Sequence, residues 1–216
     1  MIGHPNLRGM AALAATVACL SACIHATSEI GAVGGVNRTH ASRGTVAGIR
    51  AGVLGVTPVR ESDALAVQLD ASYVQRERRE NLGFLIYDPE LERDRREDYA
   101  ELSVLARGNL FGPATGSRFG VQLLLGPTLS LPLRCHRMAP DTGARHKCSG
   151  NTTVSITLGA GLDFRVNEHL ALMAGFRYGT QDFDLVVEED ASIAKFPDSS
   201  LLAGVTYRRA GRPRPQ

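Results

Sequence analysis

The stretch Ala64–Gln75, ALAVQLDASYVQ, decides the fold class because its side chains alternate in polarity. Leu65 and Val67 fall on one face of an extended chain, and Gln68 and Asp70 fall on the other. Alternation with a period of two residues is the signature of a β-strand that separates two different environments. The stretch therefore predicts a strand with one apolar face and one polar face.

The same alternation recurs along most of the chain. The further alternating stretches are EIGAVGGVN (29–37), TVAGIRAGVL (45–54), YAELSVLAR (99–107), FGVQLLLGPTLSL (119–131), TVSITLGAGLDF (153–164), LALMAGFRY (170–178) and LLAGVTYR (201–208). No amphipathic helix of useful length competes with them, because PELERDRREDY (89–99) is charged all round and is interpreted as a solvated loop. We therefore expect an all-β fold of eight antiparallel strands in up-and-down meander order.

Alternation alone fits two architectures with opposite interiors. A soluble β-sandwich buries its apolar face, whereas a membrane barrel turns apolar residues toward lipid and encloses a polar interior. The polar face here carries three arginines and three acids in mid-strand, a neutral set: Arg50, Asp70, Glu101, Arg107, Asp163 and Arg177. Buried charges must pair, and glycines on the same face leave room in a narrow lumen. We therefore predict a transmembrane β-barrel with an interior charge network.

The segments between these strands alternate in length. Short turns are expected at 58–63, 112–117 and 167–169, and longer polar loops at 76–98, 133–151 and 188–199. Outer-membrane barrels have short periplasmic turns on one rim and longer extracellular loops on the other. A tilted spanning strand needs about 9–11 residues, which the alternating stretches provide. Loop lengths and strand lengths both favour the membrane barrel.

The N-terminal residues have the order of a secretory signal. Arg8 lies in a short polar start, an apolar run follows over 10–20, and small residues precede Cys23. LSAC (20–23) resembles the lipobox of bacterial lipoproteins, which predicts lipidation of Cys23; cleavage after Ala26 is the alternative. The expected organisation is a signal peptide (1–22), an N-terminal segment (23–29), an outer-membrane barrel (30–208) and a basic Pro/Arg tail (209–216).

Several fragments together resemble a known class of proteins. IRAGVLGV (49–56), ALAVQLDASYVQ (64–75), FGVQLLLGPTLSLPL (119–133), TLGAGLDFRVNEHLALMAGFRYGTQDF (157–183) and SLLAGVTYR (200–208) are similar to the small outer-membrane β-barrel domains of the PorT/OmpX-like class. The resemblance covers roughly residues 30–208 and implies an outer-membrane barrel. One departure is the C-terminus, because such barrels usually end on an aromatic residue, whereas Tyr207 is followed here by RRAGRPRPQ.

Cys135 and Cys148 bracket the stretch CHRMAPDTGARHKC. In an exported protein, such a pair indicates a disulfide, whose loop closure would contribute about 3 kcal/mol in the chain-entropy model. A zinc site that also uses His136 and His146 is the alternative, although the spacing is not that of a zinc finger. The sequence thus favours the disulfide.

Charge and composition constrain the partners. The chain carries 24 Lys+Arg against 22 Asp+Glu, so no strong field favours nucleic acid as a partner. No phosphate-binding loop lies between a strand and a helix, and neither a cofactor nor a metal is expected. The expected partners are outer-membrane lipid and, through 76–98 and 133–151, lipopolysaccharide phosphates or a surface partner.

Three functional readings follow. The first is a non-enzymatic barrel with a structural or surface-interaction role, in which the charge network either closes the lumen or lines a narrow conducting path. The second is a lipid-anchored soluble lipocalin-like barrel, which would have a hollow apolar interior. The third is a lipid-modifying enzyme at the rim, for which His169, or His40 beside Ser42, would be needed; no convincing Ser/His/acid set joins them.

Overall fold

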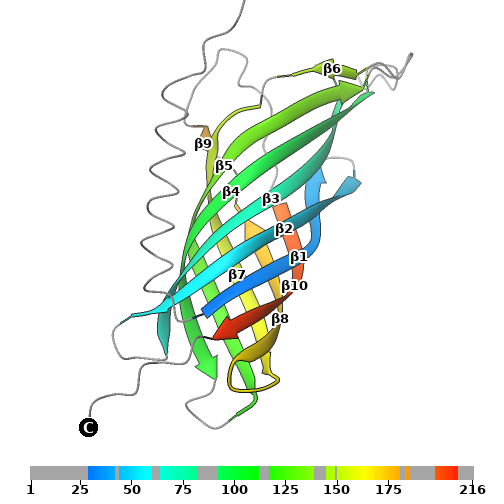
Figure 1. The fold of residues 1–216 in the computed structure, drawn as a ribbon. Helices are drawn as coiled ribbons and strands as arrows, with labels where there is room; N and C mark the ends of the chain where they lie inside the picture. The colour runs from blue at the N-terminus through cyan, green and yellow to red at the C-terminus, as the bar shows by residue number, and fades with distance from the viewer. Residues whose placement is uncertain are drawn as a thin grey trace, which may run out of the picture.

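The computed structural model describes residues 29–41, 44–59, 64–81, 92–111, 117–138, 145–148, 150–180, 183–184 and 198–208. The predicted signal peptide, the predicted lipidation at Cys23 and the predicted basic tail lie outside these residues, as does Ser42. Among the described residues, no helix is long and apolar enough to cross a membrane. The described part of the chain is built from strands (Figure 1).

Eight long strands form the body of the fold, and their bounds are β1 (Glu29–Ala41), β2 (Gly44–Pro58), β3 (Leu65–Asn81), β4 (Glu92–Phe111), β5 (Phe119–Met138), β7 (Thr153–Arg165), β8 (Leu170–Gly179) and β10 (Asp198–Arg208). Two short strands, β6 (Arg145–Lys147) and β9 (Phe183–Asp184), add to β5 and β7 respectively. Each long strand pairs antiparallel with the long strands before and after it in the chain. The order is therefore a meander.

The sheet closes on itself because its first strand pairs with its last long strand. Glu29 of β1 lies opposite Arg208 of β10, and the register continues to Thr39 opposite Asp198. No edge of the eight-stranded sheet is left along this seam, which is how a barrel avoids an exposed edge. The predicted fold, a closed eight-stranded antiparallel β-barrel, is confirmed.

The two ends of the barrel differ. The short-turn end carries the connections 59–64, 112–118 and 166–169 together with Glu29 and Arg208. The long-connection end carries the links from β3 to β4, from β5 to β7 and from β8 to β10, besides the tight β1–β2 link. At this end β3, β4 and β5 rise beyond the other strands (Figure 1). The long strands are therefore joined by short connections at one end and, apart from the β1–β2 link, by longer ones at the other, as the sequence predicted.

The prediction of a loop over 76–98 is wrong at both ends of this segment. β3 continues to Asn81 and β4 starts at Glu92, so most of the segment is a paired hairpin. The register places Glu77 opposite Arg96, and opposite charges at facing positions stabilise strand pairs. The segment PELERDRREDY was taken for a loop because a run of charges hides the period of two. β5 likewise extends to Met138, into the predicted loop 133–151.

The two faces of the barrel wall differ in polarity. In β3, Leu65 and Val67 are exposed on the outside, whereas Gln68, Asp70 and Ser72 are buried inside. Glycine at one inward position leaves room for a larger neighbour: a Cβ on Gly161 would lie 2.7 Å from Nε2 of Gln122. Small residues on the inner face thus let longer polar side chains cross the lumen.

Candidate functional site

The long-connection half of the interior holds six charged side chains, which we call the upper cluster: Arg50, Asp70, Arg76, Glu101, Arg177 and Asp198. Glu101 Oε2 lies 2.9 Å from Arg50 Nη2, and its Oε1 lies 2.7 Å from Arg76 Nη2. Arg76 Nε also reaches Asp198 at 2.6 Å, and Arg177 pairs with Asp70 at 2.7 Å. Three arginines face three acids, so the upper cluster has no formal net charge.

The upper cluster is shielded from solvent by the barrel wall. Glu101 is only 3% exposed, and Ser130 Oγ donates a hydrogen bond to it at 3.4 Å. Arg50 Nη2 donates to Ser72 Oγ at 3.0 Å. Buried charges are tolerated when each is paired, and removing one partner strands the other charge in a medium that solvates it poorly. The cluster therefore joins β2, β3, β4, β8 and β10 across the lumen.

A second group, the lower cluster, occupies the short-turn end and consists of Glu29, Arg107, Asp163 and Arg208. Arg107 Nη2 lies 2.8 Å from Asp163 Oδ2, and Arg107 Nη1 lies 3.5 Å from Glu29 Oε2. Arg208 donates to Glu29 Oε1 through both Nε and Nη2, at 2.9 and 2.5 Å. Two arginines again balance two acids, and the Glu29–Arg208 pair spans the seam between the first and last long strands.

Apolar side chains also face the interior beside the two clusters. These buried side chains are Val33, Leu54, Leu105, Leu124, Met173 and Leu202. On β4, Leu105 lies between Arg107 of the lower cluster and Glu101 of the upper one, and Leu105 is 0% exposed. Along β4 the interior therefore passes from polar through apolar to polar, whereas on β3 the buried Gln68 lies opposite Leu105 and donates to Asp70 at 3.0 Å.

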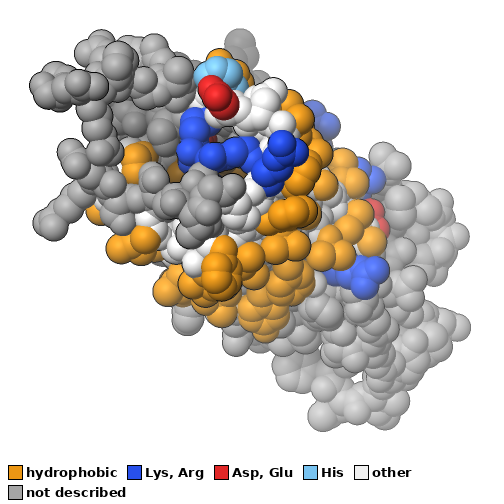
Figure 2. Space-filling view, turned by 90° about the horizontal axis from the view of Figure 1, so that it is seen from below, with side chains coloured by type: hydrophobic (Ala, Val, Ile, Leu, Met, Phe, Trp, Pro, Cys, Tyr) orange, Lys and Arg blue, Asp and Glu red, His pale blue; other side chains and the backbone are white. Residues whose placement is uncertain are grey.

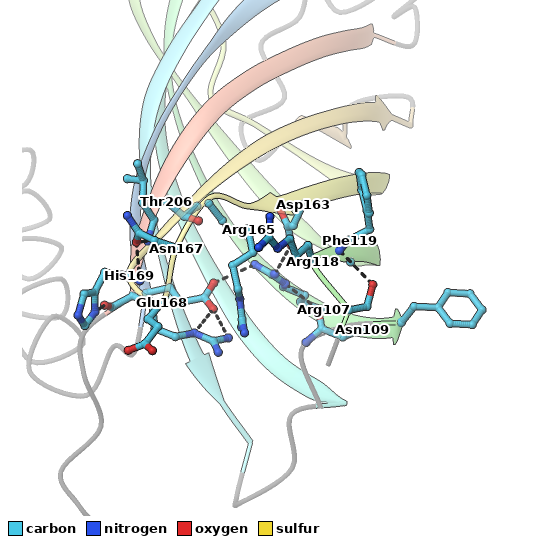
Figure 3. Close-up of a pocket in the computed structure, with 17 residues that line it drawn as sticks. Arg107, Asn109, Arg118, Phe119, Asp163, Arg165, Asn167, Glu168, His169 and Thr206 are labelled. Carbon is cyan, nitrogen blue, oxygen red and sulfur yellow. Dashed lines mark hydrogen bonds and ion pairs between the residues drawn. The ribbon is translucent and has the colours of Figure 1, made fainter. Parts of the chain in front are cut away.

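The short-turn end opens into a pocket of about 60 Å³ (Figure 3). Arg118, Arg165, Asn167 and Glu168 line it beside the lower cluster. Seen from this end, cationic side chains gather at the mouth while hydrophobic ones cover the outer wall (Figure 2). A second cavity, of about 20 Å³, lies within the upper cluster. Neither cavity was predicted from the sequence.

The six charged residues singled out from the sequence lie in two clusters among the described residues. Four of them belong to the upper cluster, whereas Arg107 and Asp163 belong to the lower cluster. Four partners were missed: Glu29, Arg76, Asp198 and Arg208. Each lies on the inward phase of its strand, so extending the period of two to the strand ends would have found them. Their positions beside turns and loops hid this signal.

Cys135 and Cys148 form the predicted disulfide, with their Cα atoms 5.0 Å apart. Because both sulfurs are in the bridge, neither is a thiolate ligand for zinc, and the alternative metal site with His136 and His146 is excluded. The bridge links the upper part of β5 to Cys148, the residue that follows β6. The residues of β6 themselves pair with β5. Its effect is therefore local to the long-connection end.

Replacing both cysteines with serine is expected to leave the barrel folded and to loosen only this end. We expect trypsin to cleave after Arg145 or Lys147 several-fold faster in the Cys135→Ser/Cys148→Ser variant, because the bridge no longer holds this segment against β5. Limited proteolysis with mass mapping measures the rate. Loss of the folded barrel itself in this variant would contradict the assignment of a local role.

The histidine considered for catalysis, His169, contacts residues at the end of β10. His169 lies in the β7–β8 turn, where its Nδ1 is 3.3 Å from the carbonyl oxygen of Arg208 and its ring stacks on Tyr207 at 5.8 Å. No serine hydroxyl bonds to His169 among the described residues. The side chain of His40 lies outside the described residues. The geometry therefore gives no support to a Ser/His nucleophile at the short-turn end.

The comparisons with known proteins concern the fold. No protein-family model and no curated protein sequence matches the chain. Neisserial surface protein A matches with a TM-score of 0.53 and 13% identity, covering 84% of this chain and 96% of that one. The outer membrane protein OprG from Pseudomonas aeruginosa matches with a TM-score of 0.52 and 13% identity, covering 86% and 97%. At such low sequence identity, the structural similarity supports the barrel fold alone.

Proposed function

We propose that this chain is an outer-membrane β-barrel with a closed lumen, and that its role is structural or surface-interacting. The observation that carries the proposal is the inversion of polarity: paired charges fill the interior, and large apolar side chains cover the outside. In water this arrangement would expose apolar surface and bury charge, both at a cost in free energy. In a bilayer the same outer surface faces hydrocarbon.

Aromatic side chains on the outer wall support a membrane location. Phe111, Phe119, Phe164 and Tyr207 all lie at strand ends on the short-turn side, and Phe119 is 66% exposed. Membrane barrels carry girdles of aromatic residues at the two interfaces, where rings contact both headgroups and acyl chains. On the opposite side, Tyr178 lies at the end of β8. The apolar band between these levels would span the hydrocarbon core.

The interior argues against the lipocalin-like alternative. Ligand pockets for small molecules have volumes of about 300–1,000 Å³, whereas the two cavities described here measure about 60 and 20 Å³. Charged and hydroxyl side chains line the inner cavity, and charged side chains lie beside Phe119 and Leu170 in the larger one at the barrel mouth. An apolar ligand would not find the volume that it requires.

The projecting part of β3, β4 and β5 is the surface that we propose for external contacts. It belongs to the segments 76–98 and 133–151, and Arg96 and Arg134 on it are exposed. Arginine forks bind phosphate oxygens in bidentate fashion, which suits lipopolysaccharide phosphates or an acidic surface partner. Export through residues 1–22 and lipidation of Cys23 belong to this proposal as well.

Conductance tests whether the lumen is closed. The purified barrel, inserted in planar bilayers, is expected to show no stable single-channel steps because side chains fill the narrow lumen. In the Leu105→Ala/Leu124→Ala variant, which removes bulk from two fully buried or nearly buried interior positions, ion conductance is expected to rise above the wild-type level. Stable steps from the wild-type barrel would show that the charge clusters line an open path and would overturn the closed-lumen proposal.

A further inference from the structure

The inner cavity, of about 20 Å³, lies within the upper cluster. The residues that line it come from all eight long strands, so the cavity lies on the axis of the barrel. Among them are Asn37 of β1, Arg50 of β2 and Arg177 of β8, which are 1%, 7% and 4% exposed. The cavity is therefore surrounded by buried polar side chains.

Three nitrogens of these side chains have no hydrogen-bond partner among the described residues: Asn37 Nδ2, Arg50 Nε and Arg177 Nη2. Each is an N–H donor. Other nitrogens of the two arginines are engaged, because Arg50 pairs with Glu101 and Arg177 pairs with Asp70. A buried donor without a partner costs free energy, and native proteins satisfy most such groups with protein atoms or ordered water. The three donors therefore point to a bound ligand.

The strand register places two of these donors on either side of Ser200. Asn37 faces Ser200 across the seam between β1 and β10, and Ser200 faces Arg177 across β10 and β8. Facing side chains have Cβ atoms about 4.5–5.5 Å apart, so the three residues form one inward row. Ser200 Oγ donates its proton to Asn37 Oδ1 at 2.8 Å, which leaves the lone pairs of this hydroxyl oxygen available as acceptors. The row thus offers donors on both sides of an acceptor.

The volume and the charge of the site indicate the chemistry of its ligand. A water molecule needs a cavity of at least about 10–15 Å³, so a cavity of about 20 Å³ has room for one. The upper cluster contains three arginines and three acids, and an added ion would leave a buried charge without compensation. The ligand is therefore neutral, accepts hydrogen bonds from N–H groups and donates to an oxygen. Buried waters make about three such hydrogen bonds.

We propose that the inner cavity binds one water molecule as a structural ligand. The water accepts hydrogen bonds from two of the three nitrogens at a time and donates one to Ser200 Oγ. It thereby links Asn37 of β1 to Arg177 of β8 across the strand that closes the barrel. The proposal depends on the closed barrel alone, so its failure would leave the proposed membrane location and surface role untouched.

A crystal structure of the full-length protein, grown in sodium bromide, tests whether water occupies the site. We expect electron density about 2.7–3.2 Å from Arg177 Nη2 and Asn37 Nδ2, without anomalous signal from bromide. An anomalous bromide peak at this place would overturn the assignment to water in favour of a monovalent anion. Well-ordered side chains with no density between them would overturn the site itself.

Gly179 allows a second test that leaves all three donors in place. It lines the inner cavity, and among the described residues an added Cβ would meet the carbonyl oxygen of Asp198 at 3.8 Å, an ordinary contact. Gly179→Ala is expected to lower the urea midpoint by about 0.5–1 M, because the methyl group takes the space of the water and leaves the donors unsatisfied. Gly179→Ser is expected to recover much of this loss, because its hydroxyl replaces the water as an acceptor.

Gly34 provides the matched control on the outer face of β1. An added Cβ there would lie 3.9 Å from the carbonyl oxygen of Arg50, a contact similar to that at Gly179. Gly34→Ala is expected to keep or raise the urea midpoint, because alanine restricts the unfolded chain more than glycine does. Gly34→Ser is expected to be no more stable than Gly34→Ala.

Two results of this comparison would overturn the proposal. The first is an equal urea midpoint for Gly179→Ala and Gly34→Ala, which would mean that the barrel needs no ligand in the inner cavity. The second is a Gly179→Ser variant no more stable than Gly179→Ala, which would mean that the donors do not require an acceptor at this place.

Discussion

Replacing Glu101 with alanine is expected to lower the free energy of unfolding by about 3–5 kcal/mol, because a buried ion pair that loses one partner leaves an uncompensated charge. Glu101 is 3% exposed and pairs with both Arg50 and Arg76. Its loss leaves the upper cluster with three arginines and two acids. After reconstitution in vesicles, the fraction of protein in the folded band on gels is measured against urea concentration or temperature. The midpoint of this unfolding transition reports the change in stability.

Two variants separate the loss of the pair from the loss of a side chain. Glu101→Gln/Arg50→Gln restores the charge balance of the upper cluster and leaves Arg76 with Asp198, so we expect it to recover a large part of the lost stability. Glu168→Gln removes an exposed acid and is expected to change stability by less than about 0.5 kcal/mol. If Glu101→Ala were as stable as Glu168→Gln, the charge clusters would not hold the barrel together.

Introducing arginine at Leu125 is expected to cost about 2–4 kcal/mol, because a charged side chain at the bilayer midplane must leave water. Leu125 lies on the outer face in the middle of the β5–β7 pairing and is 52% exposed when no lipid is considered. The same change at an exposed position of a soluble protein is usually within about ±0.5 kcal/mol. The change in unfolding free energy in vesicles therefore reports what surrounds Leu125.

Leu133 is the matched control on the same strand. It is 56% exposed, similar to Leu125, but lies beyond Ser130, the last residue of β5 that pairs with β7. Leu133→Arg is expected to cost about 0–1 kcal/mol, since charges near or above the interface stay hydrated. Equal effects at both positions would mean that the outer wall does not face hydrocarbon.

The strands could be predicted from the sequence because a period of two is a local signal. ALAVQLDASYVQ alone separates Leu65 and Val67 from Gln68 and Asp70, and the structure places the two sets on opposite faces of β3. The disulfide was also predictable, because Cys135 and Cys148 lie close together in a chain for which the sequence predicts export.

Strand ends and the grouping of charges could not be predicted in the same way. Arg76 continues the inward phase of β3, yet the charged run that follows it resembles a loop, and its partner Asp198 lies more than a hundred residues away. Which charges share a level depends on the stagger between tilted strands, and a single strand does not reveal this stagger. The split into two neutral clusters, with Leu105 between them, therefore emerges only from the closed barrel.

Gel mobility tests the central claim most directly. The full chain is expressed with its own N-terminal segment in a Gram-negative host, and the outer-membrane fraction is run in SDS with and without boiling. We expect a heat-dependent shift in that fraction, because a closed membrane barrel resists SDS until it is heated. Recovery of the chain as a soluble protein whose mobility does not change on boiling would contradict the proposed membrane barrel.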